Sequence, residues 1–106
     1  MTKAITIRPK ANVDLDDHFA YIAQDNLDMA LNFFDAFRQT LTQLARMPGM
    51  GTPYRIENPR LTGLRKWGVR GFEKYLVFYL EREDTIEVIR LLHSSRDLLN
   101  LSLIHI

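Results

Sequence analysis

The residues best suited to chemistry lie in the C-terminal half of the chain. His93 stands among arginines near the end of a β-rich run and is the best general acid or base that the sequence offers. Arg65 and Arg90 could clamp a phosphate. An acid, a base and a cationic clamp are the groups that metal-free cleavage of a phosphodiester needs. The candidates for such a site are Arg65, Lys66, Arg70, Lys74, Tyr75, Arg90, His93 and Arg96.

Each of these candidates also has a structural interpretation. His93 can be a hydrogen-bonded residue that holds the end of a strand. The two arginines can pair with the carboxylates of Glu73, Glu87 or Asp97. Arg96 and Asp97 are adjacent and of opposite charge, and this favours a role in anchoring a chain end. For His93 and the two arginines, the sequence leaves both interpretations open.

Positive charge is concentrated in one segment, although the net charge of the whole chain is only +1. Between residues 55 and 74, six basic side chains stand against two acidic ones, a local excess of four. This patch suits an anionic partner such as nucleic acid or an acidic protein tail. A solvated face without a partner is the alternative. The residues expected to bind a target are Arg65, Lys66, Arg70, Lys74 and Arg96.

Length and composition limit the kinds of protein that this chain can be. With 106 residues, of which 46% are hydrophobic, the chain fits one compact domain. It contains no cysteine, and its histidines, His18, His93 and His105, are too scattered for a metal site, so we expect no metal or other cofactor. No run approaches the roughly 20 apolar residues that a membrane span needs. We therefore expect a cytoplasmic protein.

Periodicity predicts a strand and a helical hairpin at the start. Residues 4–8 alternate apolar and polar side chains until Pro9, which predicts a short strand at a sheet edge. A helix should follow from Asn12, a possible N-cap, with Asp14, Asp16, Asp17 and His18 toward solvent. A second helix should run from about residue 27 to Pro48, because apolar residues recur there at spacings of three and four.

Three β-rich runs follow a loop over residues 48–63. They span residues 64–70, 75–80 and 86–92 and are separated by Gly71-Phe72-Glu73 and by the charged turn 81–84. This spacing predicts a meander of antiparallel strands. The order β-α-α-β-β-β predicts an α+β domain in which the helical hairpin covers one face of a small antiparallel sheet. Trp67 should belong to the core of this domain.

Four segments together resemble the RelE/ParE-type toxins of type II toxin–antitoxin systems. They are residues 11–22, 44–51, 63–79 and 86–97, and the most specific part is Leu-Arg before a Tyr-x-x-x-Tyr strand with a terminal Arg-x-x-His-x-x-Arg-Asp. The resemblance covers nearly the whole chain. It implies a compact toxin that is silenced by an antitoxin protein, which wraps around it and is usually encoded beside it.

The two branches of this superfamily differ in chemistry. RelE-like members cut messenger RNA on the ribosome without a metal, and His93, Arg65, Arg90 and Tyr75 would then be the catalytic residues. ParE-like members inhibit DNA gyrase and replication without a catalytic site of their own. The loop after the second helix lacks the lysine-rich cluster typical of RelE-like enzymes. The ParE-like branch is therefore favoured, ahead of a RelE-like ribonuclease and of an inactive binding domain.

Two further expectations concern surfaces and the end of the chain. Phe33, Phe34 and Phe37 are too many aromatic residues for one buried stripe, so Phe33 and Phe37 are expected to be partly exposed and to meet the antitoxin or a second toxin copy. The toxin domain should span residues 1–100. Residues 101–106 read like the translation of a sequencing adapter, and the alternative is a genuine apolar tail on a short helix from Ser94.

Overall fold

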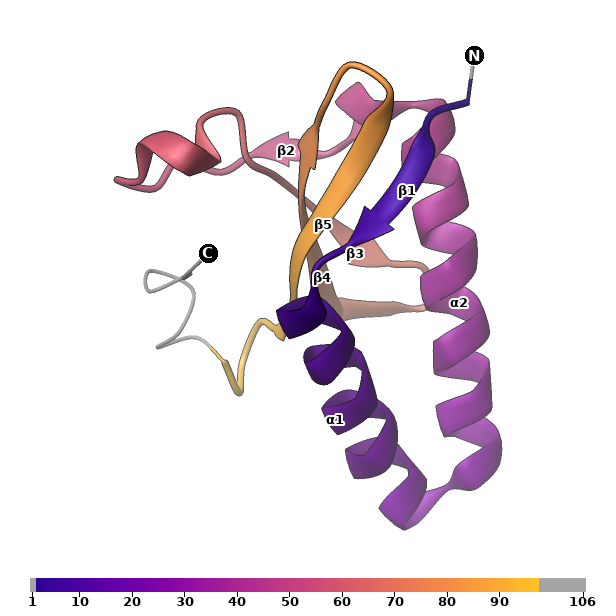
Figure 1. The fold of residues 1–106 in the computed structure, drawn as a ribbon. Helices are drawn as coiled ribbons and strands as arrows, with labels where there is room; N and C mark the ends of the chain where they lie inside the picture. Colours follow the sequence, from indigo (N-terminus) through magenta and orange to yellow (C-terminus); the bar gives the residue numbers. More distant parts are fainter. Residues whose placement is uncertain (1, 98–106) are drawn as a thin grey trace.

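The computed structural model describes residues 2–97 as two helices that pack on a five-stranded sheet (Figure 1). The strand order is β1-β5-β4-β3-β2. The predicted α+β class and the helical hairpin are therefore confirmed. The elements are β1 (Ala4–Ile7), α1 (Pro9–Asp25), α2 (Leu27–Arg46), β2 (Thr52–Pro53), β3 (Arg65–Val69), β4 (Phe72–Glu81) and β5 (Thr85–His93), with short 3₁₀ turns at Pro48–Met50 and Pro59–Leu61.

The sheet is mixed. Strands β3, β4 and β5 form the predicted antiparallel meander, and β1 lies beside β5 in parallel orientation at one edge. The expected edge position of the first strand is therefore confirmed. The expectation of a purely antiparallel sheet is wrong, because β1 pairs with β5 in the parallel direction. The two-residue strand β2 forms the opposite edge, within the predicted loop.

Two predicted boundaries are wrong. Helix α1 begins at Pro9 rather than after Asn12, with Arg8 as an extended N-cap residue that makes no side-chain cap. Proline fits the first helical position because its fixed φ suits a helix and its missing N–H would have no partner there. The turn before β4 is also shorter than expected. Gly71, with φ of +82°, makes the reversal, and Phe72 already belongs to the strand.

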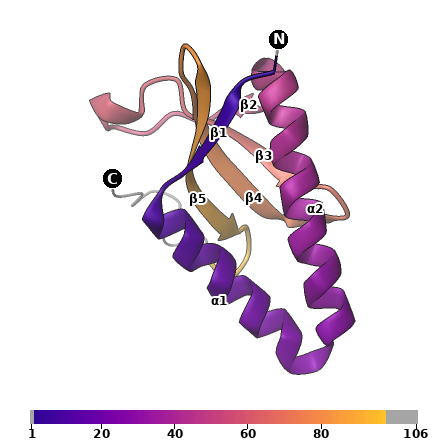
Figure 2. The same ribbon diagram turned by 45° about the vertical axis from the view of Figure 1, so that its right-hand side comes forward.

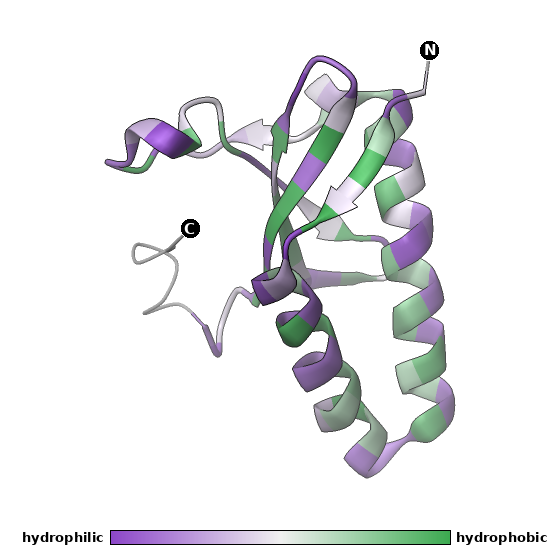
Figure 3. Ribbon diagram, in the orientation of Figure 1, coloured by the Kyte–Doolittle hydropathy of each residue, from purple (hydrophilic) through white to green (hydrophobic). Residues whose placement is uncertain are grey.

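Two hydrophobic cores lie on opposite faces of the sheet. The larger one lies between the sheet and the two helices, whose arrangement Figure 2 shows. It includes Phe33, Phe37 and Tyr79, with Trp67 packed against it. On the other face, residues 54–64 cover Phe78 and the apolar residues beside it. Figure 3 shows the apolar residues of the sheet and the helical hairpin. Both faces of β4 are therefore buried, as its two alternating apolar rows predicted.

The predicted exposure of Phe33 and Phe37 is wrong. Their exposed fractions are 0% and 1%, because both point from α2 into the larger core. Phe34, one position on, turns away from the sheet and is 38% exposed. These two residues therefore lie below the surface and are not available to a partner. The predicted tail at 101–106 lies outside the described residues, and within residues 2–97 neither helix is apolar enough over sufficient length to cross a membrane.

Candidate functional site

The upper half of β5 has a strand on both sides, whereas its lower half meets helix α1. Strand β1 pairs with β5 only as far as Ile7, which lies opposite Val88. Beyond that point, two α1 side chains contact the backbone of Leu91. Asp14 Oδ2 accepts the Leu91 N–H at 3.0 Å, and His18 Nε2 lies 2.8 Å from the Leu91 carbonyl oxygen, which can only accept. The helix thus continues the hydrogen bonding of the sheet edge through side chains.

Asp14 and His18 are the site residues that the sequence reasoning missed. Both were expected to face solvent, but each is only 9% exposed. They lie four positions apart, so they share one face of α1 with the buried Ala11 and Leu15. That spacing, which places a carboxylate and an imidazole in an apolar helical stripe, is the signal from which they could have been found.

Arg90 is held by Asp14 in a buried, two-pronged ion pair. Its Nε donates to Asp14 Oδ2 at 2.7 Å and its Nη2 donates to Asp14 Oδ1 at 3.0 Å. The side chains are only 10% and 11% exposed. Two of the three guanidinium nitrogens of Arg90 therefore already bind a carboxylate, which is the structural role that the sequence left open beside the phosphate clamp. None of the three partners expected from the sequence is the one that it uses.

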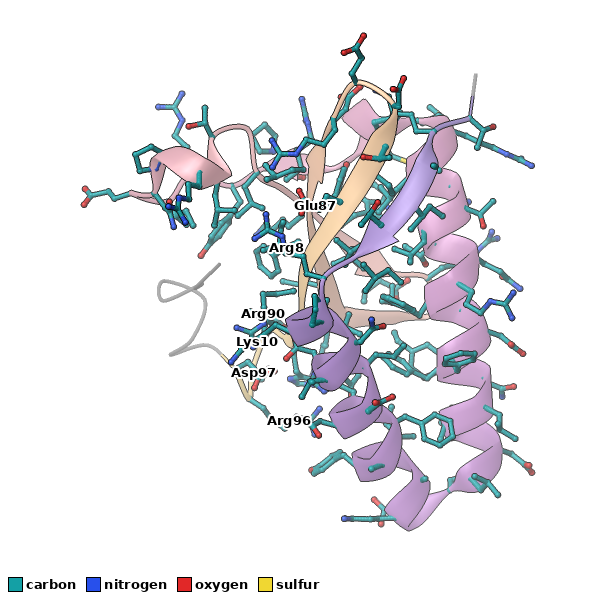
Figure 4. The ribbon with its side chains drawn as sticks, in the orientation of Figure 1. Arg8, Lys10, Glu87, Arg90, Arg96 and Asp97 are labelled. Atoms are coloured by element: carbon teal, nitrogen blue, oxygen red, sulfur yellow. The ribbon has the colours of Figure 1, made fainter. Side chains whose placement is uncertain are left out.

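Glu87, one of those expected partners, binds two other arginines. Arg8 Nε donates to one of its oxygens at 2.7 Å, and Arg82 donates to the other at 3.0 and 3.1 Å. The hydrogen bond from Arg8 is the main cause that lowers the pKa of Glu87, and burial opposes it. Figure 4 shows Arg8 and Glu87 above the start of α1, and Arg90, Asp97 and Arg96 lower, beside the first half of that helix.

His93 closes the chain reversal that follows β5. Its Nδ1 accepts hydrogen bonds from the N–H groups of Ser95 and Arg96, at 3.1 and 3.0 Å. The N–H of His93 itself donates to Asp97 Oδ2 at 2.7 Å. Burial, followed by the charge of Arg96, lowers the pKa of His93. These contacts are those of a residue that holds a strand end, and they occupy its Nδ1.

Tyr75 and Arg96 join His93 at the same corner. The Tyr75 hydroxyl accepts a hydrogen bond from Arg96 Nη2 at 2.9 Å, and the Tyr75 ring lies edge to face against His18 and His93, with ring centres 5.0 and 4.7 Å away. The Arg96 guanidinium also lies 3.9 Å from the centre of the Tyr21 ring. A shallow pocket opens here, lined by Asp14, Asp17, His18, Tyr21, Arg90, Leu92, Arg96 and Asp97.

Arg65 lies at the other end of the sheet. Its Nη1 donates to the carbonyl oxygen of Gly51 at 2.6 Å, and the Tyr79 hydroxyl accepts from the N–H of the same glycine at 2.9 Å. Burial raises the pKa of Tyr79. Arg65 on β3 lies opposite Tyr79 of β4. His93 on β5 lies opposite Tyr75, which is four residues from Tyr79 along β4. At a strand rise of about 3.3 Å per residue, Arg65 and His93 are separated by roughly 13 Å along the sheet alone.

The remaining basic residues do not converge on one point. Lys66 Nζ lies 5.4 Å from the centre of the Tyr54 ring, while Arg70 and Lys74 are exposed on either side of the β3–β4 turn. Among residues 2–97, no three histidine or acidic side chains come close enough to hold a metal ion. The sequence candidates are thus divided between a corner around His93, an anchor around Arg65 and a dispersed basic surface.

A helical hairpin on one face of a small mixed sheet defines the fold class of this small α+β protein. Among solved structures, a chain of the chromosomal ParDE TA system from P. aeruginosa shares this fold. Its TM-score is 0.61 at 18% sequence identity, over 85% of this chain and 94% of that one. No curated protein matches the sequence.

The sequence itself identifies the family. The family described as ParE toxin of type II toxin-antitoxin system, parDE, matches residues 5–98, which is nearly the whole chain. The protein therefore belongs to the ParE toxin family. The predicted superfamily and the preference for its ParE-like branch are confirmed.

Proposed function

We propose that this protein is a toxin that binds DNA gyrase, blocks replication and is neutralised by a cognate antitoxin in the cytoplasm. Membership of the ParE family of type II toxin–antitoxin systems supports the toxin and antitoxin roles. Action on gyrase rather than on messenger RNA is the finer step. This step rests on the contacts made by the four residues that a ribonuclease centre would have to use, which are Arg65, Tyr75, Arg90 and His93.

The observation that carries this step is that each of the four is already engaged in a structural contact. Arg90 is paired with Asp14, His93 Nδ1 accepts two backbone N–H groups, and Arg65 is bound to the 48–51 turn. The Tyr75 hydroxyl is bound by Arg96. An acid–base catalyst needs a cationic clamp beside it. Arg90 is bound to Asp14, and Arg65 lies roughly 13 Å from His93 along the sheet, so neither predicted clamp is free beside His93. Binding of a protein target needs no such clamp.

A RelE-like ribonuclease is the second candidate, and one observation favours it. His93, Tyr75 and Arg96 lie at one corner of the fold, beside a shallow pocket that Arg96 lines. A change in the turn after β5 could release both His93 and Arg96 toward a bound RNA. Under this alternative the dispersed residues Lys66, Arg70 and Lys74 would contact the ribosome or the message.

Purified components separate the two candidates. Toxin added to gyrase, ATP and relaxed plasmid should inhibit supercoiling, and antitoxin added first should prevent this. The His93→Ala, Arg65→Ala double variant should inhibit as well as the wild type, because Arg65 is held by the 48–51 turn and is therefore not one of the basic residues left for the target. A melting curve checks that the variant is folded. Unimpaired supercoiling, together with cleavage of messages on translating ribosomes that the double variant abolishes, would support the ribonuclease instead.

A further inference from the structure

The outer edge of β3 is only partly covered by another strand. Strand β2 pairs with Arg65 and Lys66 and reaches no further along β3. The Tyr54 N–H donates to the Leu64 carbonyl oxygen, so the peptide group of Leu64 faces away from β4. Because successive residues of a strand point their peptide groups to opposite edges, Lys66 and Gly68 face the same way as Leu64. The N–H and carbonyl groups of Gly68 therefore point outward, past the end of β2.

A pocket of about 420 Å³ opens at this edge. Its lining consists of Gln43, Met50, Trp67, Gly68, Arg70, Glu73 and Leu76. Trp67 packs against the larger core on the helical face of the sheet, whereas Leu76 packs against the core on the other face. One pocket reaches both faces because Gly68, which follows Trp67 and pairs with Leu76, has no side chain. An incoming segment could therefore contact apolar side chains on both sides of the edge.

Trp67 and Arg70 are the side chains of this pocket best suited to anchor a protein partner. Trp67, the one tryptophan of the chain, is only partly buried. The Arg70 side chain is exposed, and none of the ion pairs among residues 2–97 involves it. Tryptophan and arginine are enriched among the residues that contribute most to the binding energy of protein interfaces. The pocket thus combines an apolar surface, a free cation and an open peptide group.

The charge along this edge favours an acidic occupant. Lys66 lies two residues before Gly68, and Arg70 lies two residues after it. The one acid in the lining, Glu73, turns toward the β3–β4 turn, where its Oε2 accepts the Gly71 N–H at 2.7 Å. A second copy of this chain is a poor occupant, because antiparallel pairing of two β3 edges about Gly68 would set Lys66 of one copy near Arg70 of the other. Carboxylates of a different protein would complement both cations.

An extended segment fits this edge better than a helix does. Its residue opposite Gly68 would exchange two backbone hydrogen bonds with that glycine and would point its side chain toward Leu76. An aromatic residue at that position covers the surface that an edge glycine leaves open. The residues on either side of it would point toward Trp67, and a carboxylate about two positions along would lie near Arg70. A helix would leave the Gly68 peptide group unpaired.

We propose that gyrase, the target of the toxin, adds a short acidic segment to the β3 edge at Gly68 and seats an apolar side chain in the pocket beside it. This inference rests on the proposed function, because it takes gyrase as the target. The wrapping that the family resemblance implies for an antitoxin needs a longer surface than this edge offers. Of the predicted target-binding residues, Lys66 and Arg70 then meet gyrase, while Arg65 and Arg96 are held in structural contacts.

The test compares two pocket variants with two matched controls. Arg70→Glu reverses the free charge at the pocket, and Lys10→Glu makes the same change of charge at an exposed position of α1. Gln43→Trp fills the pocket from α2, and Gln24→Trp places the same side chain at an exposed position of α1. Melting curves check that each full-length variant is folded. Supercoiling by gyrase is measured over a range of toxin concentrations, and calorimetry measures binding of the protein encoded beside the toxin gene.

Arg70→Glu and Gln43→Trp should each raise the toxin concentration that halves supercoiling by about tenfold or more, because one brings like charges and the other a bulky ring into the contact. Both should still bind the antitoxin as the wild type does, and the two controls should inhibit gyrase as the wild type does. Hydrogen exchange followed by mass spectrometry tests the site without a substitution. The peptide that contains Gly68 should gain protection when gyrase is added to the wild-type toxin, and none when only the antitoxin is added.

Three results would overturn the inference alone, each obtained while the wild-type toxin inhibits gyrase. The first is full inhibition by both pocket variants, with no gain of protection at Gly68. The second is loss of antitoxin binding in these variants with inhibition unchanged, which would make the antitoxin the occupant. The third is a toxin dimer that both variants dissociate, which would make a second copy the occupant. A wild-type toxin that neither binds nor inhibits gyrase would overturn the proposed function and this inference with it.

Discussion

Asp14 and Arg90, 76 positions apart in the sequence, form a buried ion pair that fastens α1 to the lower half of β5. The same carboxylate accepts the N–H of Leu91, so one side chain serves both the guanidinium group and the unpaired strand edge. Because the β1 ladder ends at Val88, this pair and His18 take its place over the rest of β5.

Removal of one partner of this pair should destabilise the protein strongly. Asp14→Ala leaves a buried guanidinium and a backbone N–H without an acceptor, so the free energy of unfolding should fall by about 3–5 kcal/mol. Urea denaturation measures the change. The Asp14→Leu, Arg90→Met double variant should recover a large part of the loss, because no buried charge remains. Asp16→Ala, on the exposed side of the same helix, should change stability by about 0.5 kcal/mol or less. Equal stability of Asp14→Ala and wild type would show that the pair contributes nothing.

The 48–51 turn allows a matched pair of glycine substitutions. A Cβ at Gly51 would overlap the Tyr79 hydroxyl and ring, which are fixed in the core by hydrogen bonds to Gly51 and Pro48. Gly51→Ala should therefore lower the free energy of unfolding by about 1–3 kcal/mol. At Gly49 a Cβ would meet no atom within 4 Å, so Gly49→Ala should be close to neutral. Thermal melts of the two variants compare them directly, and equal melting temperatures would refute the close approach at Gly51.

His93 should make stability depend on pH. Burial and Arg96 lower the pKa of His93 in the fold, with Lys74 and His18 acting in the same direction and Asp97 against it. The unfolded chain therefore takes up this proton first, and the stability from His93, complete above its ordinary pKa of 6.5, is lost as the pH falls.

The comparison that isolates this effect is wild type against His93→Asn, which keeps an acceptor near the Nδ1 position and cannot titrate. As the pH falls from 6.5 to 4.5, the wild type should lose more stability than the variant. Below that range, protonation of Glu87, whose pKa is also lowered in the fold, destabilises both proteins. Urea midpoints measured across the range provide the test. Parallel pH profiles for the two proteins would mean that His93 does not titrate differently in the fold.

Much of the fold follows from local patterns in the sequence. The apolar stripe of α2, the Asn26 cap before it and the two apolar rows of β4 each specify their element without help from distant residues. The start of α1 was misplaced because Asn12 looked like a cap, although Pro9 is the better helix start. The parallel pairing of β1 with β5 could not be predicted, since it joins segments about 80 positions apart through backbone groups that every residue has.

The site was harder to predict because the role of each side chain depends on which residues of other elements it contacts. Arg90 as a residue type suits a phosphate clamp, and only its approach to Asp14 on another element shows that it is a structural residue. Phe33 and Phe34 are adjacent aromatics in one helix, and their opposite fates depend on the side from which the sheet approaches. The number of aromatic residues in α2 wrongly predicted that Phe33 and Phe37 are exposed. The spacing of Asp14 and His18 in α1, in contrast, would have predicted correctly that both are buried.

The most direct test of gyrase inhibition is induced expression in a bacterial host, with DNA synthesis and messenger RNA integrity followed in parallel. The wild type and the His93→Ala, Arg65→Ala double variant are compared at equal protein levels. Halted DNA synthesis with intact messages, in both strains, is the predicted result. Rapid cleavage of messages by the wild type, abolished in the double variant, would contradict it and identify a ribonuclease.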